Sequence, residues 1–440
     1  MVRLLGKGRL GALVGIVALA AMFAAYGTAT AASAKQSSGP LVVWVDAPRV
    51  SAVKAFEKAY PHIKVQMNLI NDNIGNDQME GKFQLFNRTG SGWPDVIFFP
   101  TNSDISWASS PQIAYTANLT HLVPKSIQNG YAKAAIAPCV INGQLWCLRN
   151  DDAADVLWYN AKLFKQWGYT PPKTWPQYEA LGLKIAKQHP GYYVGTLGTS
   201  YAFDRYFWGS ECPANQLVGP NKVLINIKAP DCMRMVNLLD TLLKAKVLST
   251  VGLFTSAMSS KVGPKLVMTP GATWYGVFEF QDAFHVPAGQ ITAAPPLTWP
   301  GQNVTGDEGG GLWGVSSHIS GQLLKNALTF LEFVTTNPKN QVDLAPTLPA
   351  YGPDEMPWLE HNVLQSNYFA DKQTMVKAMI QATKMVWSGH PYTEFDPDGI
   401  WDSTVAAALV RGESLAQIWP TFQTQLVNYA HLYNYTVVTK

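Results

Sequence analysis

The sequence predicts an α/β protein built of two lobes, and three observations support this fold class. The chain has 440 residues, more than one compact core usually holds. Strand and helix patterns alternate along its N-terminal part, as in a doubly wound sheet. Residues 95–99, with the sequence DVIFF, form a short apolar run that is typical of a strand covered on both faces.

The individual elements follow from hydrophobic periodicity and from chain-breaking residues. Thr174, with Gln177 three residues later, has the spacing of a helix N-cap, so a helix is expected from 175 to 187. Strands are expected at 39–46, 62–70, 95–99, 156–160, 265–269 and 312–316, the fifth of them before a turn at Pro270-Gly271. Further helices are expected at 50–59, 78–87, 233–246, 275–283, 322–335 and from 372 onward, with Gly412 in the last break.

The chain is expected to pass between the lobes more than once. Candidate crossing segments are 148–155, 305–311 and 345–351. The first lobe would then comprise 35–150 and 311–348, and the second lobe 151–310 and 349–440. Several crossings would form a hinge whose few residues absorb a closing motion.

The first 34 residues have the pattern of a signal peptide. Three basic residues precede an apolar stretch at 10–25, and Ala32-Ser33-Ala34 provides an A-x-A cleavage site. The alternative is a retained membrane anchor, although about 16 residues are few for spanning a bilayer. No cysteine precedes Cys139, so the lipid anchor of bacterial lipoproteins is not available. We expect cleavage after Ala34 and export to the periplasm or the extracellular face of the membrane.

Four cysteines in an exported protein suggest two disulfides. Cys139 and Cys147 flank a hairpin with an Asn142-Gly143 turn, and Cys212 and Cys232 form the other expected pair. A strict two-residue turn would leave the first pair one step out of register, whereas a three-residue turn or a bulge would bring the two cysteines opposite. No CxxC motif or metal-ligand spacing is present.

Composition and motifs argue against several function classes. The net charge of +3 is spread thinly, which gives little support for nucleic-acid binding. No G-x-S-x-G elbow, H-E-x-x-H helix or Walker loop occurs, so no catalytic residue, metal or cofactor is expected. The 15 tryptophans exceed the needs of an ordinary core, so some of these rings are expected to line a site.

Two acidic doublets, Asp151-Asp152 and Asp307-Glu308, raise the alternative of an exported glycoside hydrolase. Adjacent residues of an extended segment point to opposite sides, so neither doublet can itself flank one bond. A catalytic pair drawn from both doublets stays open. Carboxylates near the crossing segments would equally accept hydrogen bonds from ligand hydroxyls.

Aromatic rings beside short polar residues at strand ends suggest sugar recognition. A sugar presents C–H faces that pack on rings, and hydroxyls that need donors and acceptors. Ligands of open α/β sheets bind at the carboxyl ends of strands. The residues with this character are Trp44 before Asp46, Phe99 before Thr101 and Asn102, and Trp208, Trp274 and Trp401.

The segment LWYNAKLFKQWGYTPPKTWPQYEALGLKIAK resembles the most recognisable stretch of the extracellular solute-binding proteins of ABC sugar importers, the maltose-binding-like family 1. The resemblance extends over the mature chain through six further segments: LVVWVDAPR, GWPDVIFF, NGQLWCL, KLVMTPGATW, GGGLWGVS and VRGESLAQ. The resemblance implies a two-lobed periplasmic-binding-protein fold of type II, with a multi-segment hinge. Members of the family bind their ligand without transforming it.

The resemblance also implies a set of ligand-binding residues. Asn102-Ser103 stands where maltodextrin binders tend to have a charged pair. Together with the rings above, the predicted set is Trp44, Asp46, Arg49, Phe99, Thr101, Asn102, Asp151, Asp152, Tyr206, Trp208, Trp274, Gly310 and Trp401.

The function that we expect is a monomeric exported receptor that captures a sugar and delivers it to the permease subunits of an ABC transporter. The alternatives are the glycoside hydrolase above and a structural or adhesive surface protein. Turnover of an oligosaccharide would indicate the hydrolase, and the absence of any small-molecule binding would indicate the surface protein.

Overall fold

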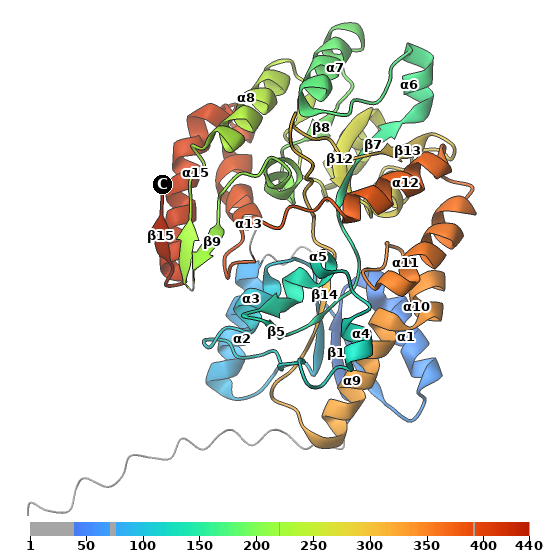
Figure 1. The fold of residues 1–440 in the computed structure, drawn as a ribbon, viewed down its shortest axis with the longest axis vertical. Helices are drawn as coiled ribbons and strands as arrows, with labels where there is room; N and C mark the ends of the chain where they lie inside the picture. The colour runs from blue at the N-terminus through green and yellow to red at the C-terminus, as the bar shows by residue number, and fades with distance from the viewer. Residues whose placement is uncertain (1–38, 71–75, 220, 390–391, 440) are drawn as a thin grey trace, which may run out of the picture.

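The computed structural model describes residues 39–70, 76–219, 221–389 and 392–439. The predicted signal peptide, residues 1–34, lies outside the described residues. The described chain forms two lobes, one above the other in Figure 1. The first lobe contains the N-terminal strands and helix α9 (Gly321–Thr336), and the second contains most of the remaining chain.

The first lobe is built on a five-stranded sheet. Its strand order is β2 (Val65–Leu69), β1 (Leu41–Val45), β3 (Val96–Phe99), β14 (Leu312–Val315) and β6 (Leu148–Arg149). β1 pairs parallel with β2 and β3, whereas β14 runs antiparallel to β3 and β6. The doubly wound pattern therefore holds for the three N-terminal strands, and the late strand β14 returns in the opposite direction.

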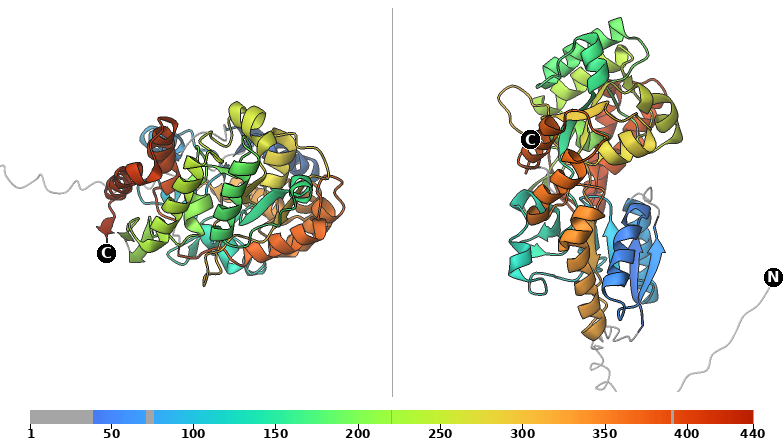
Figure 2. Two further views of the ribbon diagram at one scale, coloured as in Figure 1. Left: turned by 90° about the horizontal axis from the view of Figure 1, so that it is seen from above. Right: turned by 90° about the vertical axis from the view of Figure 1, so that its right-hand side faces the viewer.

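Helices cover this sheet, and α9 runs along its lobe in Figure 2. The other helical segments and the small hairpin of this part are η1 (Ala47–Arg49), α1 (Val50–Ala59), α2 (Asn76–Thr89), α3 (Asp104–Ala108), α4 (Lys125–Gln128), α5 (Lys133–Ile136), η2 (Ala137–Cys139), β4 (Val140–Ile141), β5 (Gln144–Leu145) and α10 (Pro338–Asp343).

The second lobe has an antiparallel sheet in which β7 (Asp155–Asn160) lies between β12 (Met268–Ala272) and β13 (Ile291–Ala294). The prediction of a strand at 265–269 followed by a turn at Pro270-Gly271 was wrong, because both residues lie within β12. β12 is an edge strand, where a proline without an N–H can be tolerated. Two smaller sheets pair β8 (Gly195–Thr196) with β11 (Leu248–Ser249), and β10 (Lys222–Leu224) with β9 (Gln216–Gly219) and β15 (Thr436–Val438).

The helices of the second lobe begin and end at recognisable signals. The Thr174 hydroxyl accepts the N–H of Gln177 at the start of α7, and Gly168 ends α6 with φ of 68°. The helical segments are α6 (Ala161–Trp167), α7 (Trp175–Gln188), η3 (Asp204–Trp208), α8 (Pro230–Lys244), η4 (Met258–Val262), η5 (Gly263–Lys265), η6 (Gly276–Ala283), α11 (Gly352–Trp358), η7 (Leu359–Leu364), α12 (Lys372–Thr383), α13 (Pro397–Trp401), η8 (Asp402–Ala406), α14 (Ala407–Val410) and α15 (Leu415–Leu432).

Each lobe has its own hydrophobic core. The core of the first lobe includes Phe56, Trp313 and Phe330. The second lobe has two clusters, one around Trp401 and one around Trp158. Between the cores lie the three segments that the sequence analysis expected to cross.

These crossing segments lie side by side and are joined by backbone hydrogen bonds. The N–H groups of Asn150 and Asp151 donate to the carbonyls of Gly311 and Gly310, both at 2.9 Å. The N–H of Asp152 donates to the carbonyl of Leu348 at 2.8 Å, so 345–351 joins the other side of 148–155. We refer to the three paired segments as the crossing ribbon.

Both expected disulfides are confirmed: Cys139 pairs with Cys147 and Cys212 pairs with Cys232. Asn142-Gly143 forms the strict two-residue turn, and the first pair is one step out of register as expected, because Trp146 lies opposite Cys139 and donates its N–H to the Cys139 carbonyl at 2.9 Å. The disulfide closes without the three-residue turn or bulge that would bring the cysteines opposite. Cys147 directly follows Trp146, and its Cα lies 4.9 Å from that of Cys139.

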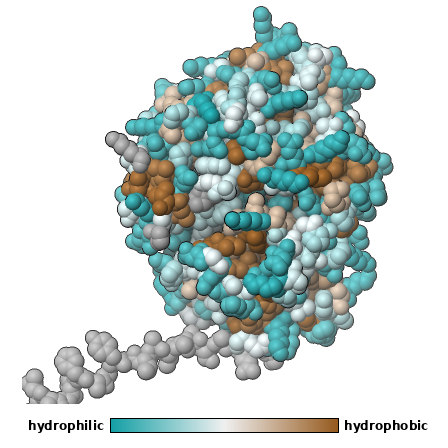
Figure 3. All heavy atoms as spheres, in the orientation of Figure 1, coloured by the Kyte–Doolittle hydropathy of each residue, from teal (hydrophilic) through white to brown (hydrophobic). Residues whose placement is uncertain are grey.

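Within the described residues, every helix falls short of the length and apolarity that crossing a bilayer requires. On the face that Figure 3 shows, apolar side chains gather in separate patches among hydrophilic ones.

We predict that the double substitution Cys212→Ser/Cys232→Ser lowers the free energy of unfolding by about 3 kcal/mol, because the disulfide closes a 20-residue separation in the unfolded chain. Urea unfolding of the oxidised protein measures this loss. The matched variant Cys139→Ser/Cys147→Ser opens a loop with a separation of 8 and should lose slightly less. Equal stability of the first variant and the wild type would contradict the prediction.

Candidate functional site

A cleft of about 350 Å³ lies where the two lobes meet the crossing ribbon. The first lobe contributes Asp46, Pro48, Arg49, Phe98 and Pro100 to its lining. The ribbon contributes Asp151, Glu308, Gly310 and Gly311. The second lobe contributes Tyr201, Leu253, Phe254, Ser259, Trp274, Phe278, Glu279 and Ala283.

Arg49 connects these three parts of the cleft. It ends η1, whose N-cap Asp46 accepts its backbone N–H, and its guanidinium is 2.8 Å from the Asp46 carboxylate. The same guanidinium is 3.4 Å from Oδ1 of Asp151 on the ribbon. It lies over the ring of Phe98 at 4.2 Å and within 5.9 Å of the Phe278 ring in the second lobe. Two carboxylates thus fix a cation beside two aromatic faces.

Trp274 forms the centre of an aromatic wall on the second lobe. Its ring follows β12 and its Nε1–H donates to the carbonyl of Glu308 at 2.9 Å, which fixes the indole plane. Phe254 stacks on it at an interplanar angle of 27°, and Tyr201 meets it edge-on at 64°. We define the aromatic wall as Tyr201, Phe254, Trp274 and Phe278, all of which line the cleft.

The Tyr201 ring is held by a strained loop. Ser200 and Tyr201 both have positive φ, at 74° and 59°, which non-glycine residues rarely adopt. Asp402 accepts the N–H of Ser200, and Asp398 accepts the N–H groups of Tyr201 and Phe203. These carboxylates at the start of α13 and η8 offset the strain and direct Tyr201 into the cleft.

The glycine run of the ribbon allows close approach to the cleft floor. Gly309, Gly310 and Gly311 all have positive φ, at 81°, 94° and 51°. A Cβ on Gly310 would lie 2.4 Å from the Arg149 guanidinium and 2.5 Å from the carbonyl of Asp151. Only glycine fits there, which explains the run without a phosphate-binding role.

The side chains of Asp307 and Glu308 point to opposite sides of the ribbon, as expected for adjacent residues of an extended segment. Asp307 binds the buried Arg149 at 2.7 Å in the first lobe, and Glu308 binds the buried Arg205 at 2.9 Å in the second. Arg149 also lies 3.7 Å from Asp152. Burial raises the pKa of Asp152 to about 8, although the nearby Arg149 opposes the rise.

Five of the predicted residues come together in the cleft: Asp46, Arg49, Asp151, Trp274 and Gly310. Phe99 does not. Successive strand residues face opposite sides, so Phe99 packs into the first-lobe core and Phe98 lines the cleft in its place. Trp44 likewise packs edge-on against Phe83 and Phe86 within the first lobe.

Three polar residues of the predicted set support the ribbon or a helix start and do not line the cleft. The N–H of Thr101 donates to Asp104 at 2.9 Å, just before α3. The Asn102 amide donates to Oδ2 of Asp307 at 3.2 Å. Asp152 faces Arg149, as described above.

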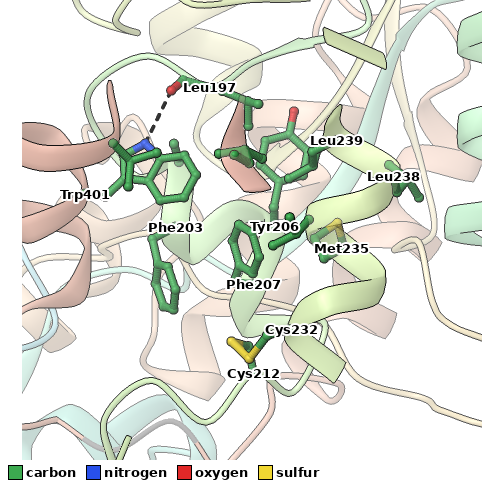
Figure 4. Close-up of a cluster of buried hydrophobic side chains, with 14 of the residues drawn as sticks. Leu197, Phe203, Tyr206, Phe207, Cys212, Cys232, Met235, Leu238, Leu239 and Trp401 are labelled. Atoms are coloured by element: carbon green, nitrogen blue, oxygen red, sulfur yellow. Dashed lines mark hydrogen bonds between the residues drawn. A yellow bond between two sulfur atoms is a disulfide. The ribbon is translucent and has the colours of Figure 1, made fainter. Parts of the chain in front are cut away.

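Tyr206, Trp208 and Trp401 lie in the interior of the second lobe and away from the cleft lining. Figure 4 shows Tyr206 and Trp401 among the apolar side chains of the hydrophobic cluster around Trp401. The Nε1–H of Trp401 donates to the carbonyl of Leu197, 3.3 Å away. Trp208 is also buried, and its Nε1–H donates to the carbonyl of Trp387 at 2.8 Å. Tertiary packing covers these rings, although local sequence had placed them beside polar loops.

Sequence reasoning missed several cleft residues, above all Tyr201, Phe254, Phe278 and Glu279. Tyr201 and Phe254 follow the short strands β8 and β11, so recognition of these strands would have placed both rings at carboxyl ends. Phe278 and Glu279 lie in a helix and carried no such signal. In the described part of the chain, no cluster of His, Cys, Asp and Glu is arranged to hold a metal ion.

Two lobes, a crossing ribbon and a cleft lined by both lobes define a protein of the two-lobed periplasmic-binding class. The chain belongs to the family of bacterial extracellular solute-binding proteins, whose family profile matches residues 45–341. No curated protein sequence matches it.

Solved structures with the same fold cover nearly the whole chain. The ABC transporter associated binding protein from B. animalis subsp. lactis Bl-04, in complex with β-1,6-galactobiose, has a TM-score of 0.76 at 19% identity, over 91% of this chain and 99% of that one. The galacto-N-biose-/lacto-N-biose I-binding protein of Bifidobacterium longum, with lacto-N-biose, has a TM-score of 0.73 at 17% identity, over 92% and 100%. UgpB from Mycobacterium tuberculosis, with glycerophosphocholine, has a TM-score of 0.69 at 17% identity, over 89% and 98%. At these identities the likeness establishes the fold.

We predict that Arg149→Met destabilises the protein by about 3–5 kcal/mol, because it leaves the buried Asp307 carboxylate without its ion-pair partner. Chemical unfolding at pH 7 measures the effect. The double variant Arg149→Met/Asp307→Asn should recover most of the loss, since it removes the uncompensated charge as well. The single variant Asp307→Asn completes the cycle, and a double variant whose loss of stability equals the sum of the losses of the two single variants would show that the pair is not coupled.

Proposed function

We propose that this protein is an exported receptor that binds a neutral mono- or disaccharide in its interlobe cleft and delivers it to an ABC transporter permease. The observation that carries this proposal is the aromatic wall around Trp274, which faces the carboxylates of Asp46 and Asp151 across one cleft. Sugar C–H faces pack on such rings, and sugar hydroxyls donate to such carboxylates.

The charge of the cleft favours a neutral ligand over an anionic one. Among the described residues that line it, Arg49 is the only basic one, and two carboxylates already surround its guanidinium. A phosphate or carboxylate ligand would meet Asp46, Asp151 and Glu308 with one shared cation. The phosphate group of glycerophosphocholine, the ligand in the UgpB structure, does not suit this potential, so the two disaccharides are the better guides to this cleft.

The size of the cleft favours a small sugar. Ligand pockets usually enclose about 300–1,000 Å³, and this one, at about 350 Å³, lies near the lower end. One or two sugar rings suit this space better than a long oligosaccharide does.

Binding without hydrolysis agrees with the pairing of the cleft carboxylates. Asp46 and Asp151 bind Arg49, and Glu308 binds Arg205 and the hydroxyl of Tyr275. Retaining and inverting glycosidases need one carboxyl that releases a proton to the leaving group. These glycosidases also need a second carboxylate as nucleophile or base, and Asp46, Asp151 and Glu308 are all held in ion pairs, which leaves Glu279 as the one unpaired carboxyl among the described residues that line the cleft. The family to which the chain belongs consists of binding proteins.

The delivery step rests on the multi-segment ribbon. We propose that it acts as a hinge, that a bound sugar favours the closed arrangement of the lobes, and that the closed monomer is what the permease recognises. The predicted signal peptide would place the mature protein at the outer side of the cytoplasmic membrane.

A thermal-shift screen tests the ligand class. We expect a neutral mono- or disaccharide to raise the melting temperature, since a ligand that binds only the folded state stabilises it, while glycerophosphocholine and uronic acids leave it unchanged. The screen should include β-1,6-galactobiose, lacto-N-biose and maltose. Stabilisation by the zwitterionic glycerophosphocholine or the anionic uronic acids alone, or release of monosaccharides from any oligosaccharide, would contradict the proposal.

A matched pair of tryptophan variants tests the site. Trp274→Leu should weaken binding of the stabilising sugar by about tenfold or more, because it removes the stacking face. Trp401→Leu should lower the free energy of unfolding by about 3 kcal/mol and leave the affinity unchanged, because that ring lies in the core. Calorimetric titration well below both melting temperatures measures the affinities. Equal losses of affinity in the two variants would remove Trp274 from the site.

A further inference from the structure

Glu279 differs from the other carboxyl groups of the cleft. It lies in η6, next to Phe278 of the aromatic wall, and lines the cleft with only 2% of its surface exposed. In the described part of the chain, its carboxyl group makes no hydrogen bond or ion pair, unlike Asp46, Asp151 and Glu308. Its oxygens are not among the fully buried polar atoms that lack a partner, so they reach the cleft space, and a ligand that displaces water from them must supply a partner.

The helix that carries Glu279 has wide turns. η6 is a π-helix of eight residues, Gly276–Ala283. Such wide turns are rare in proteins and occur frequently at functional sites, although η3, η4, η7 and η8 of this chain share the geometry. Here the turn keeps both Phe278 and Glu279 on the cleft side.

The charged groups around Glu279 do not provide the missing partner. Arg205 lies near enough to act on it electrostatically, but its guanidinium is already paired with Glu308 and Tyr275. Glu308 repels a second negative charge at this position. Across the cleft, Asp46 and Asp151 enclose Arg49 and add to the negative potential.

Burial and the nearby Glu308 carboxylate raise the pKa of Glu279 to about 8, and Arg205 opposes the rise only in part. At neutral pH the group therefore carries its proton. An undissociated carboxyl has an O–H donor and a carbonyl acceptor side by side. Asp46 and Asp151, by contrast, can only accept hydrogen bonds when ionised.

We propose that Glu279 is a specificity-determining residue of the cleft: as a neutral acid it donates to one sugar oxygen and accepts from the adjacent hydroxyl. This inference rests on the proposed sugar-binding function and adds a donor to a cleft whose other carboxylates accept. It selects a ligand with an acceptor oxygen beside a hydroxyl at the η6 end of the cleft. A ligand without that pair leaves a buried carboxyl unsatisfied and binds more weakly.

The test is calorimetric titration from pH 6 to pH 9.5, with the neutral disaccharides β-1,6-galactobiose, lacto-N-biose and maltose as probes. For the wild type, we expect a constant affinity up to about pH 7.5 and a loss approaching tenfold per pH unit above the pKa, because binding requires the proton. Glu279→Gln keeps a donor and an acceptor, so it should bind about threefold more weakly at pH 7 and lose the pH dependence. Glu279→Met has neither and should bind at least about tenfold more weakly at every pH.

Two controls accompany the titrations. Asp282→Asn changes an exposed carboxyl of the same helix and should leave affinity and pH profile unchanged. Unfolding measured without ligand checks the protonation state. The folded protein holds a proton on Glu279 that the unfolded chain releases above about pH 4.5, so the wild type should lose stability between pH 4.5 and 8 relative to Glu279→Gln.

Each outcome decides a different claim. Wild-type affinity in Glu279→Met, or an unchanged pH profile in Glu279→Gln, would overturn the role of Glu279 while leaving sugar binding intact. A sugar affinity that rises with pH in the wild type and shows no such rise in Glu279→Gln would overturn the neutral acid, because the ionised carboxylate would then be the form that binds, as an acceptor only. If no probe binds the wild type at any pH, the proposed function itself fails and this inference fails with it.

Discussion

The structure depends on the crossing ribbon, whose adjacent carboxylates Asp307 and Glu308 bind one buried arginine on the side of each lobe. Its strands are joined by backbone hydrogen bonds, such as those from Asp151 to Gly310 and from Asp152 to Leu348. Asp307 then binds Arg149 on the side of the first lobe, and Glu308 binds Arg205 on the side of the second. Buried ion pairs contribute little net stability, but they tolerate few alternative arrangements. They therefore fix where each lobe meets the ribbon.

The cleft follows from this arrangement. Glu308 carries Arg205 on its carboxylate and accepts the Trp274 indole N–H on its backbone carbonyl, so the ribbon positions the aromatic wall directly. On the other side, Asp151 extends from the ribbon to Arg49, which lies over Phe98. Groups of both lobes that line the cleft are thus attached to one backbone element. A hinge at this element would open or close the cleft without disturbing either core.

The sequence predicted the fold better than it predicted the site. Strong periodicity and capping located α7 after Thr174 and most strands within a few residues, and the adjacent carboxylates were expected to diverge. Predicted site residues that directly follow a strand, such as Asp46 after β1, line the cleft. Rings such as Trp401 did not, because tertiary packing covers them from elements far away in sequence. The local sequence gives no indication of the raised pKa of Glu279, because that rise comes from burial in the folded protein.

The central claim is that one small neutral sugar is held between the two lobes by groups attached to the crossing ribbon. A crystal structure with the disaccharide that most raises the melting temperature tests it most directly. The account predicts a sugar ring against the Trp274 face, hydroxyls toward Asp46 and Asp151, and a sugar oxygen within hydrogen-bond distance of Glu279. A sugar bound elsewhere on the surface, or in contact with one lobe alone, would contradict it.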